Sequence, residues 1–159
     1  MKIIGLDLST KCSGYSVFSD TTLLSHGVID LSKNKDMEER SKQMMLEVGK
    51  IIKREAPDYV LVENTWNKNN VETTKALSYI IGAVLYQCYL NNITAEKILP
   101  STWRARVGLH QGKKKRSELK QEAIEMVKQK YSFDPIEDEA EAILIGLSKS
   151  YLNEDDLFE

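Results

Sequence analysis

Two carboxylates stand at the ends of apolar runs that are typical of buried strands. Asp7 closes KIIGLD, and Glu63 closes YVLVE, whose first four residues form a continuous apolar run. A buried carboxylate is costly unless it has a partner, which can be a cation, a helix N-terminus or a metal. If the two strands are parallel neighbours, their carboxyl ends meet at the edge where open α/β sheets place their sites. We therefore expect Asp7 and Glu63 to emerge next to each other.

A second pair of acids opens the last predicted helix. In EDEAEAILIGL, Asp138 and Glu141 are three residues apart and share one helix face, whereas Glu139 points elsewhere. Their face continues into Ala142 and Ile145, so one end of a core-facing stripe consists of carboxylates. Four converging carboxylates would repel one another, and a hard cation relieves this repulsion. We expect Mg²⁺, for which Mn²⁺ can substitute, because two such ions about 4 Å apart can activate a water that attacks a phosphodiester.

Each acid also has an ordinary structural explanation. Asp7 can be a cap or turn residue, and Glu63 can belong to a loop. Asp138 and Glu141 can be acids that the helix macrodipole favours at an N-terminus. The joint occurrence of these acids at the ends of two central strands and at the start of one late helix favours a common site.

Positive charge is concentrated just before the final acidic segment. Residues 97–130 carry ten Lys and Arg against three Glu, a net charge of +7, whereas residues 134–159 carry one Lys against nine acids. The whole chain has a net charge of only −2, so the sum hides this separation. Cations dominate nucleic-acid affinity by neutralising phosphates, although a charge run is often only a solvated face. The candidate DNA-binding cations are Arg104, Arg106, Lys113, Lys114, Lys115, Arg116 and Lys120.

Two tryptophans accompany these charges. Trp66 lies three residues after Glu63 in the polar stretch NTWNKNN, where an exposed indole suits stacking on an unpaired base. Its alternative is a side chain that folds back onto the core. Trp103, which precedes Arg104, is expected to be packed.

The elements that must position these residues follow from periodicity. Strands are expected at 2–8, 14–19, 23–30, around 59–62 and at 93–99, and helices at 36–55, 71–90, 117–130 and 137–152, with Ser117 as an N-cap. Residues 100–116 read as a loop with a short helical turn, and the tail 153–159 is expected to fray. This order predicts an α/β fold, with a five-stranded mixed sheet and helices on both faces.

Composition limits the class of protein. The 159 residues suit one domain, with 42% hydrophobic and 29% charged residues. No apolar run approaches the roughly 18 residues of a membrane span, and Met1 leads straight into a strand rather than a signal peptide, so we expect a cytoplasmic protein without membrane contact. Cys12 and Cys88 are expected to be free thiols. The helix at 71–90 is apolar on more than one face, which indicates a homodimer interface or burial on both sides within one chain.

Four segments together resemble the RuvC family of Holliday-junction resolvases, in a phage-like version. They are GLDLSTKCSGYSVF, YVLVENTW, LPSTWRARVG with the following GKKKR, and DEAEAILIGL, and the resemblance covers residues 2–148. It implies an RNase H-like fold, a homodimer and metal-dependent nicking of two opposed strands at a four-way DNA junction. By position, Asp7, Glu63, Asp138 and Glu141 match the family's catalytic and metal-binding acids, and Trp66 matches an aromatic that contacts the junction near its crossover.

The chain departs from the bacterial pattern of that family at two places. Leu8-Ser9 stands where Pro-Gly is usual, and Glu141 stands where aspartate is usual. Glutamate is longer than aspartate by one methylene, so the distance between its carboxylate and a metal site changes, while the carboxylate can still ligate the ion.

Three other functions are compatible with part of this pattern. A nuclease of the same fold can act on RNA–DNA hybrids or on other branched DNA. A catalytically silent module can bind branched DNA with the acids in structural roles, but a binding surface gains nothing from concentrating negative charge near phosphate. An actin-like sugar kinase also begins with an acid-bearing strand and a hydroxyl-rich turn, but it needs a second such domain.

Overall fold

A five-stranded mixed sheet forms the centre of the molecule, as the sequence predicts. The computed structural model describes residues 1–64 and 70–155, with side chains described as far as Leu152. The strand order is β3-β2-β1-β4-β5. The first three strands form an antiparallel meander, and β1 then pairs in parallel with β4, which pairs in parallel with β5. Their bounds are β1 Lys2–Asp7, β2 Cys12–Ser19, β3 Thr22–Asp30, β4 Tyr59–Glu63 and β5 Thr94–Ile98.

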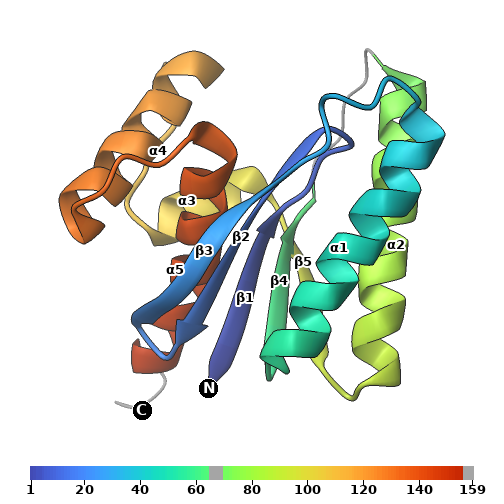
Figure 1. Cartoon of the computed structure of the whole chain (residues 1–159). Coiled ribbons are helices and arrows are strands. Elements are labelled where there is room, and N and C mark those ends of the chain that lie inside the picture. Colours follow the sequence, from blue (N-terminus) through green and yellow to red (C-terminus); the bar gives the residue numbers. More distant parts are fainter. Residues whose placement is uncertain (65–69, 156–159) are drawn as a thin grey trace.

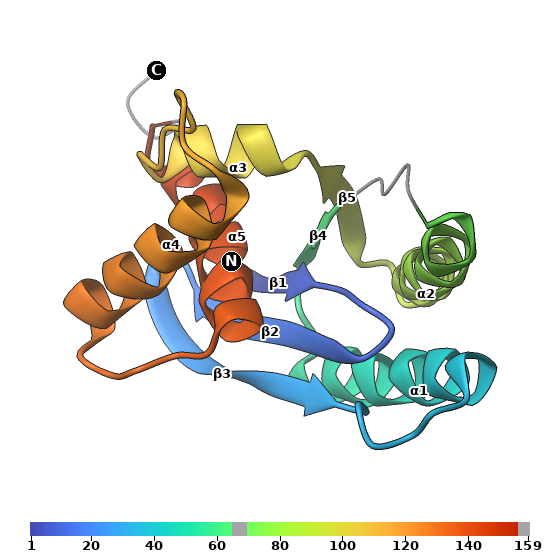
Figure 2. The same cartoon turned by 90° about the horizontal axis from the view of Figure 1, so that it is seen from above.

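Helices cover both faces of this sheet. Helices α1 (Met37–Glu55) and α2 (Val71–Leu90) lie on one face, and α3 (Pro100–Arg106), α4 (Arg116–Tyr131) and α5 (Glu137–Asp155) lie on the other (Figure 1, Figure 2). Within the described residues, no helix combines the length and the apolar character that crossing a membrane requires.

Helix α3 is larger than the single helical turn that the sequence predicts for this region. It has seven residues and begins with Pro100, whose fixed φ suits the first helical position. Trp103 lies buried in its middle. Seven residues are too few to show a helical period of apolar side chains, so the sequence does not reveal this helix. Its position depends instead on one large side chain, Trp103, that enters the core.

Strand alternation divides the core into two layers. Ile3 and Leu61 point to the layer beneath α3, α4 and α5. Ile4 and Val60 point to the layer beneath α1 and α2. Because side chains alternate between the two faces of a strand, the odd-numbered acids at the ends of β1 and β4 lie on the α5 side.

Glycines allow α5 to lie unusually close to the sheet. A Cβ atom on Gly5 would stand 2.4 Å from the backbone nitrogen of Gly146, and one on Gly14 would stand 1.9 Å from the carbonyl oxygen of Asp138. Real Cβ contacts are never this short, so both strand positions must be glycine for the helix to pack here. The first turn of α5 is therefore pressed against β2 beside the end of β1.

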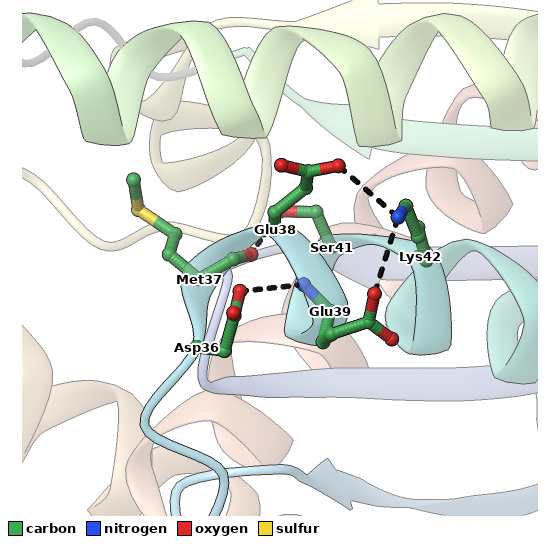
Figure 3. A network of polar contacts seen from close by, with 6 residues as sticks. All are labelled: Asp36, Met37, Glu38, Glu39, Ser41 and Lys42. Carbon is green, nitrogen blue, oxygen red and sulfur yellow. Dashed lines mark hydrogen bonds and ion pairs between the residues drawn. The ribbon is translucent and has the colours of Figure 1, made fainter.

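Helix α1 begins one residue later than the sequence predicts, because Asp36 is its N-cap rather than its first helical residue. The carboxylate of Asp36 accepts a hydrogen bond from the backbone N–H of Glu39 at 3.0 Å, which satisfies one of the free donors of the first turn. Lys42 pairs with both Glu38 and Glu39 at 3.1 Å (Figure 3). The helix ends at Glu55, two residues before Pro57, with Ala56 in the left-handed conformation.

Helices α4 and α5 also differ from their predicted bounds. Helix α4 begins at Arg116, so Ser117 lies inside it and is not the N-cap. The N-cap is Lys115, whose backbone N–H donates a hydrogen bond to the Glu118 carboxylate at 2.6 Å. A glutamate three residues into the helix can satisfy a backbone donor in this way without a capping hydroxyl. Helix α5 continues to Asp155, so the first three residues of the tail expected to fray have helical backbone. Residues 156–159 lie outside the described part.

Candidate active site

Asp7 and Glu63 emerge at neighbouring carboxyl ends of the sheet. Leu6 is registered with Val62 in the parallel β1–β4 pair, and the two acids follow directly. Burial raises the pKa of Asp7 well above its usual range, and the negative charges of Glu63, Glu141 and Asp138 raise it further. The other three predicted carboxylates are therefore all close enough to Asp7 for their charges to act on it.

Glu63 is held by the indole of Trp103. The glutamate side chain is 5% exposed, and Trp103 Nε1 donates a hydrogen bond to its Oε2 at 2.5 Å. Burial raises the pKa of Glu63, and this hydrogen bond and the positive charges of Arg104 and Arg116 oppose the rise. The expected packing of Trp103 is confirmed, since the ring is fully buried.

Glu141 is paired with Arg104. The distance from Arg104 Nη2 to Glu141 Oε1 is 3.1 Å, and both side chains are buried. The guanidinium carbon of Arg104 lies 5.0 Å from the centre of the Trp103 ring. Arg104 was expected on a DNA-binding surface, whereas the structure turns it inward, because α3 packs against α5 and carries this side chain toward the carboxylates.

Asp138 and Glu139 point in different directions, as expected. The thiol of Cys12 lies beside Asp138; burial and its hydrogen bond to that carboxylate raise the pKa of Cys12 to about 12. Glu139 instead lies on the β3 side of α5, where its Oε1 is 2.6 Å from His26 Nδ1. Cys12 and Cys88 are both free thiols, as predicted.

The predicted DNA-binding cations occupy different places. Lys113, Lys114, Lys115 and Arg116 are exposed. Arg116 also lines a pocket of about 370 Å³ together with Glu63, Arg104 and Gln111.

Two further predicted cations lie apart from this exposed run. Lys120 is partly buried and pairs with Glu137. Its positive charge lowers the pKa of Asp7, so Lys120 acts on the predicted site. Arg106 acts on the pKa of Tyr59, at the start of β4 and away from Glu63. Trp66 lies outside the described residues.

The four carboxylates supply the oxygen ligands that a hard divalent cation takes, although their side chains are not grouped as a preformed metal site. Across residues 1–64 and 70–155, no three His, Cys, Asp or Glu side chains stand together in a metal-binding group. The physical reason is visible at two of them, because Glu63 is turned to Trp103 and Glu141 to Arg104. In the described hydrogen bonds each of these two uses one oxygen, so its second oxygen can ligate an ion. Asp7, Glu63, Asp138 and Glu141 are the residues that could hold it.

Sequence reasoning did not assign Trp103, Cys12 or the inward Arg104 to the site. One signal was present for Trp103, because a buried indole N–H needs an acceptor and the predicted strand around 59–62 is followed by the carboxylate of Glu63. Cys12 gave no signal of its own, since its approach to Asp138 depends on the close packing of α5 on β2.

Comparison with known proteins gives the relatives of this chain. The family model described as crossover junction endodeoxyribonuclease RuvC matches residues 3–148. RuvC of Chlamydia muridarum is 27% identical over 156 residues, which cover 94% of this chain and 91% of the relative. RuvC of Fusobacterium nucleatum is 27% identical over 104 residues, and this match spans 63% of the chain and about half, 55%, of the relative.

Two solved structures share the fold. The Thermus thermophilus RuvC structure aligns with a TM-score of 0.77 at 19% identity, covering 98% of this chain and 97% of that chain. The Fowlpox virus resolvase in complex with substrate Holliday junction DNA aligns with a TM-score of 0.66 at 18% identity, covering 100% of both chains. These likenesses show the RuvC-type, RNase H-like fold. Because the family model matches nearly the whole chain, this protein belongs to the RuvC family of crossover junction endodeoxyribonucleases.

Proposed function

We propose that this chain resolves Holliday junctions by metal-dependent hydrolysis of phosphodiester bonds. The observation that carries the proposal is the meeting of four carboxylates from β1, β4 and α5 at one edge of the sheet. Asp7, Glu63, Asp138 and Glu141 are the proposed metal-binding and catalytic acids. Mg²⁺ or Mn²⁺, when bound, would supply an activated water and stabilise the leaving oxygen.

The chain's own cations complete the site. Lys120 and Arg116 flank the carboxylates from α4, one acting on Asp7 and the other on Glu63. A fixed positive charge beside a reacting phosphate stabilises the charge that develops there. Among the four residues of the exposed basic run, Arg116 is therefore the one that we expect to affect the cutting rate as well as DNA affinity.

The function is tested by incubating the purified chain with labelled four-way junction, flap, RNA–DNA hybrid and linear duplex. We expect paired nicks in the junction with Mg²⁺ or Mn²⁺, and none in excess EDTA. Cutting that continues undiminished in EDTA would contradict the metal assignment. Binding without cutting under all conditions would favour the silent DNA-binding module, and preferred cutting of the hybrid would favour the RNase H-type activity.

The exposed basic run is proposed to contact phosphates. Replacing Lys113, Lys114, Lys115 and Arg116 by Ala should weaken binding to every DNA substrate alike and flatten the slope of log affinity against log salt by up to about 0.9 per lost contact. A matched control removes the same number of cations from α1 and α2, on the opposite face of the sheet: Lys42, Lys50, Lys53 and Lys75. An unchanged slope in the first variant would mean that its run is a solvated face.

The proposal also includes a stacking role for Trp66, a phage-like origin and a location in the cell. Trp66 stays our candidate for stacking on an unpaired base at the junction. The phage-like character inferred for this chain stays a proposal; the fowlpox neighbour is a viral resolvase that shares its fold. A resolvase acts where DNA recombines, so we place it in the cytoplasm, or in the host cytoplasm if a phage encodes it.

We further propose that two copies pair through α2. Tyr79, Tyr86 and Tyr89 are 65%, 64% and 79% exposed, which leaves an aromatic stripe uncovered in the single chain. Gly82 lies between them, and a Cβ atom there would meet no described atom within 4 Å. Glycine within a helix costs about 1 kcal/mol relative to alanine, and close approach of a second helix would explain it.

Sedimentation equilibrium measures this pairing. The full chain should have the mass of two 18.1 kDa copies, and Tyr86→Glu should shift it toward one copy because a charge then enters the apolar contact. A wild-type mass of one copy at the concentrations that cut DNA would contradict the proposal.

A further inference from the structure

Helix α3 contacts two of the four carboxylates through consecutive side chains. Trp103 reaches the glutamate at the end of β4, and Arg104 reaches the glutamate on α5. Both contacts are buried, and both acids are among those proposed to hold metal. We propose that α3 is a positioning element of the site, in which Trp103 fixes the orientation of Glu63 and Arg104 is a built-in cation that holds Glu141 until a divalent metal binds.

The Trp103 contact constrains how Glu63 can act. A hydrogen bond to an ionised carboxylate is among the stronger kinds, and at 2.5 Å this one is short. The ring has no freedom to turn away, because it is fully buried in the core beneath α3, α4 and α5. With Oε2 engaged by the indole N–H, the other oxygen of Glu63 is the one left to ligate a metal.

The Arg104 contact has a different consequence. Its guanidinium has five N–H donors and remains charged at all relevant pH values. One nitrogen pairs with Glu141, while Nε is buried without a hydrogen-bond partner among the described residues. The buried carboxylates of Glu63 and Glu141 would be strongly unfavourable without a nearby cation. Arg104 therefore stabilises the metal-free chain. It also competes with an incoming metal for the same carboxylate.

The Trp103 half of the proposal rests on the proposed metal site and is tested by metal binding without DNA. Free Mn²⁺ is counted by electron paramagnetic resonance while the full chain is titrated. Trp103→Phe removes the N–H, and we expect Mn²⁺ affinity to fall about tenfold or more, as is typical when a residue that orients a ligand is lost. Val127→Ala is the matched control, since Val127 is fully buried in the same core and its apolar side chain cannot hydrogen-bond to the acids.

Because Phe also leaves a gap, a second substitution isolates the hydrogen bond. 3-Benzothienylalanine at position 103 has the shape of tryptophan and no N–H, and it should reproduce the loss of Mn²⁺ affinity. Wild-type affinity in both position-103 variants would mean that Trp103 only fills the core. Equal loss in Val127→Ala would show that general destabilisation is the cause.

The Arg104 half is tested by melting temperature with and without Mg²⁺. Arg104→Met keeps much of the stem and removes the charge, so the metal-free chain should melt at a lower temperature and the rise caused by Mg²⁺ should exceed that of the wild type. Arg104→Lys should restore part of the metal-free stability, because it supplies a charge without the planar fork. A purely structural role would lower both melting temperatures equally and leave the Mg²⁺-induced rise unchanged.

These measurements separate the two proposals. If the wild type binds Mn²⁺ and gains stability with Mg²⁺ but the variants match it, only the positioning role of α3 is overturned. If the wild type shows neither effect, the metal site itself fails, and the positioning role fails with it.

Discussion

Asp7→Asn should abolish junction cutting, with a loss of about 10³-fold or more in rate at saturating DNA and metal. The amide keeps the shape of the side chain and removes the charge that holds a divalent ion, and such an ion supplies several kcal/mol of charge stabilisation during phosphodiester hydrolysis. Glu63→Gln, Asp138→Asn and Glu141→Gln should have the same effect. Single-turnover cutting of a labelled junction measures the rate.

DNA binding and folding should survive these changes. Loss of a negative charge near the scissile phosphate should leave junction affinity intact or raise it. The pKa of Asp7 is raised in the folded chain, mainly by burial, so its charged form destabilises the metal-free fold at neutral pH. The neutral Asn should therefore keep or raise the melting temperature without metal.

The matched control is Glu139→Gln. Glu139 is an acid on the same turn as Asp138, but it faces His26 and β3. Its variant should cut at nearly the wild-type rate. If any three of the four amide variants of the proposed ligands also cut at that rate, the metal-site assignment is wrong.

Gly14→Ala should damage both the fold and the site. The new Cβ would lie 1.9 Å from the carbonyl oxygen and 2.5 Å from the carbonyl carbon of Asp138, and backbone atoms cannot rotate away. Helix α5 must then move off the sheet. Overpacking of this kind costs about 1–3 kcal/mol of unfolding free energy, and a misplacement of about 1 Å at a catalytic group can cost 10²-fold in rate. Denaturant unfolding and junction cutting measure the two effects.

Gly49→Ala provides the matched control for this prediction. There the nearest atom is Oε1 of Gln87, at 2.6 Å, which is the far end of a flexible side chain that can move. Helix propensity also favours Ala within α1 by about 1 kcal/mol. We expect unfolding free energy and cutting rate near those of the wild type. If Gly14→Ala behaved like Gly49→Ala, close packing of α5 on β2 would not be what places Asp138.

Local patterns account for much of the fold. The apolar runs of β1 and β4, the periodicity of α1 and the position of Asp36 are properties of neighbouring residues, and the structure confirms the elements that they predict. Helix α3 was underestimated because seven residues carry too little periodicity. The start of α4 was misplaced by one residue because Glu118, rather than a hydroxyl, satisfies the cap.

The approach of the four acids could also be anticipated from the sequence. Strand alternation puts Asp7 and Glu63 on one face if β1 and β4 are parallel neighbours, and a spacing of three puts Asp138 and Glu141 on one side of a helix. Gly14 and Gly146 then bring that helix to the sheet. The pairing of β1 with β4 and the packing of α5 beside the ends of these strands had to be assumed.

The sequence by itself therefore determined that carboxylates stand at the ends of two strands and on one face of the last helix, because periodicity and strand ends are local properties. The tertiary structure alone decided what each carboxylate touches. Arg104 belongs to the same basic segment as Lys113 and Lys114, yet it is buried on Glu141, and Trp103 donates to Glu63. These contacts depend on where α3 packs against α5, which is distant in the chain. A buried indole indicates that some acceptor is needed, but neither charge nor apolar character indicates which carboxylate each of these side chains reaches.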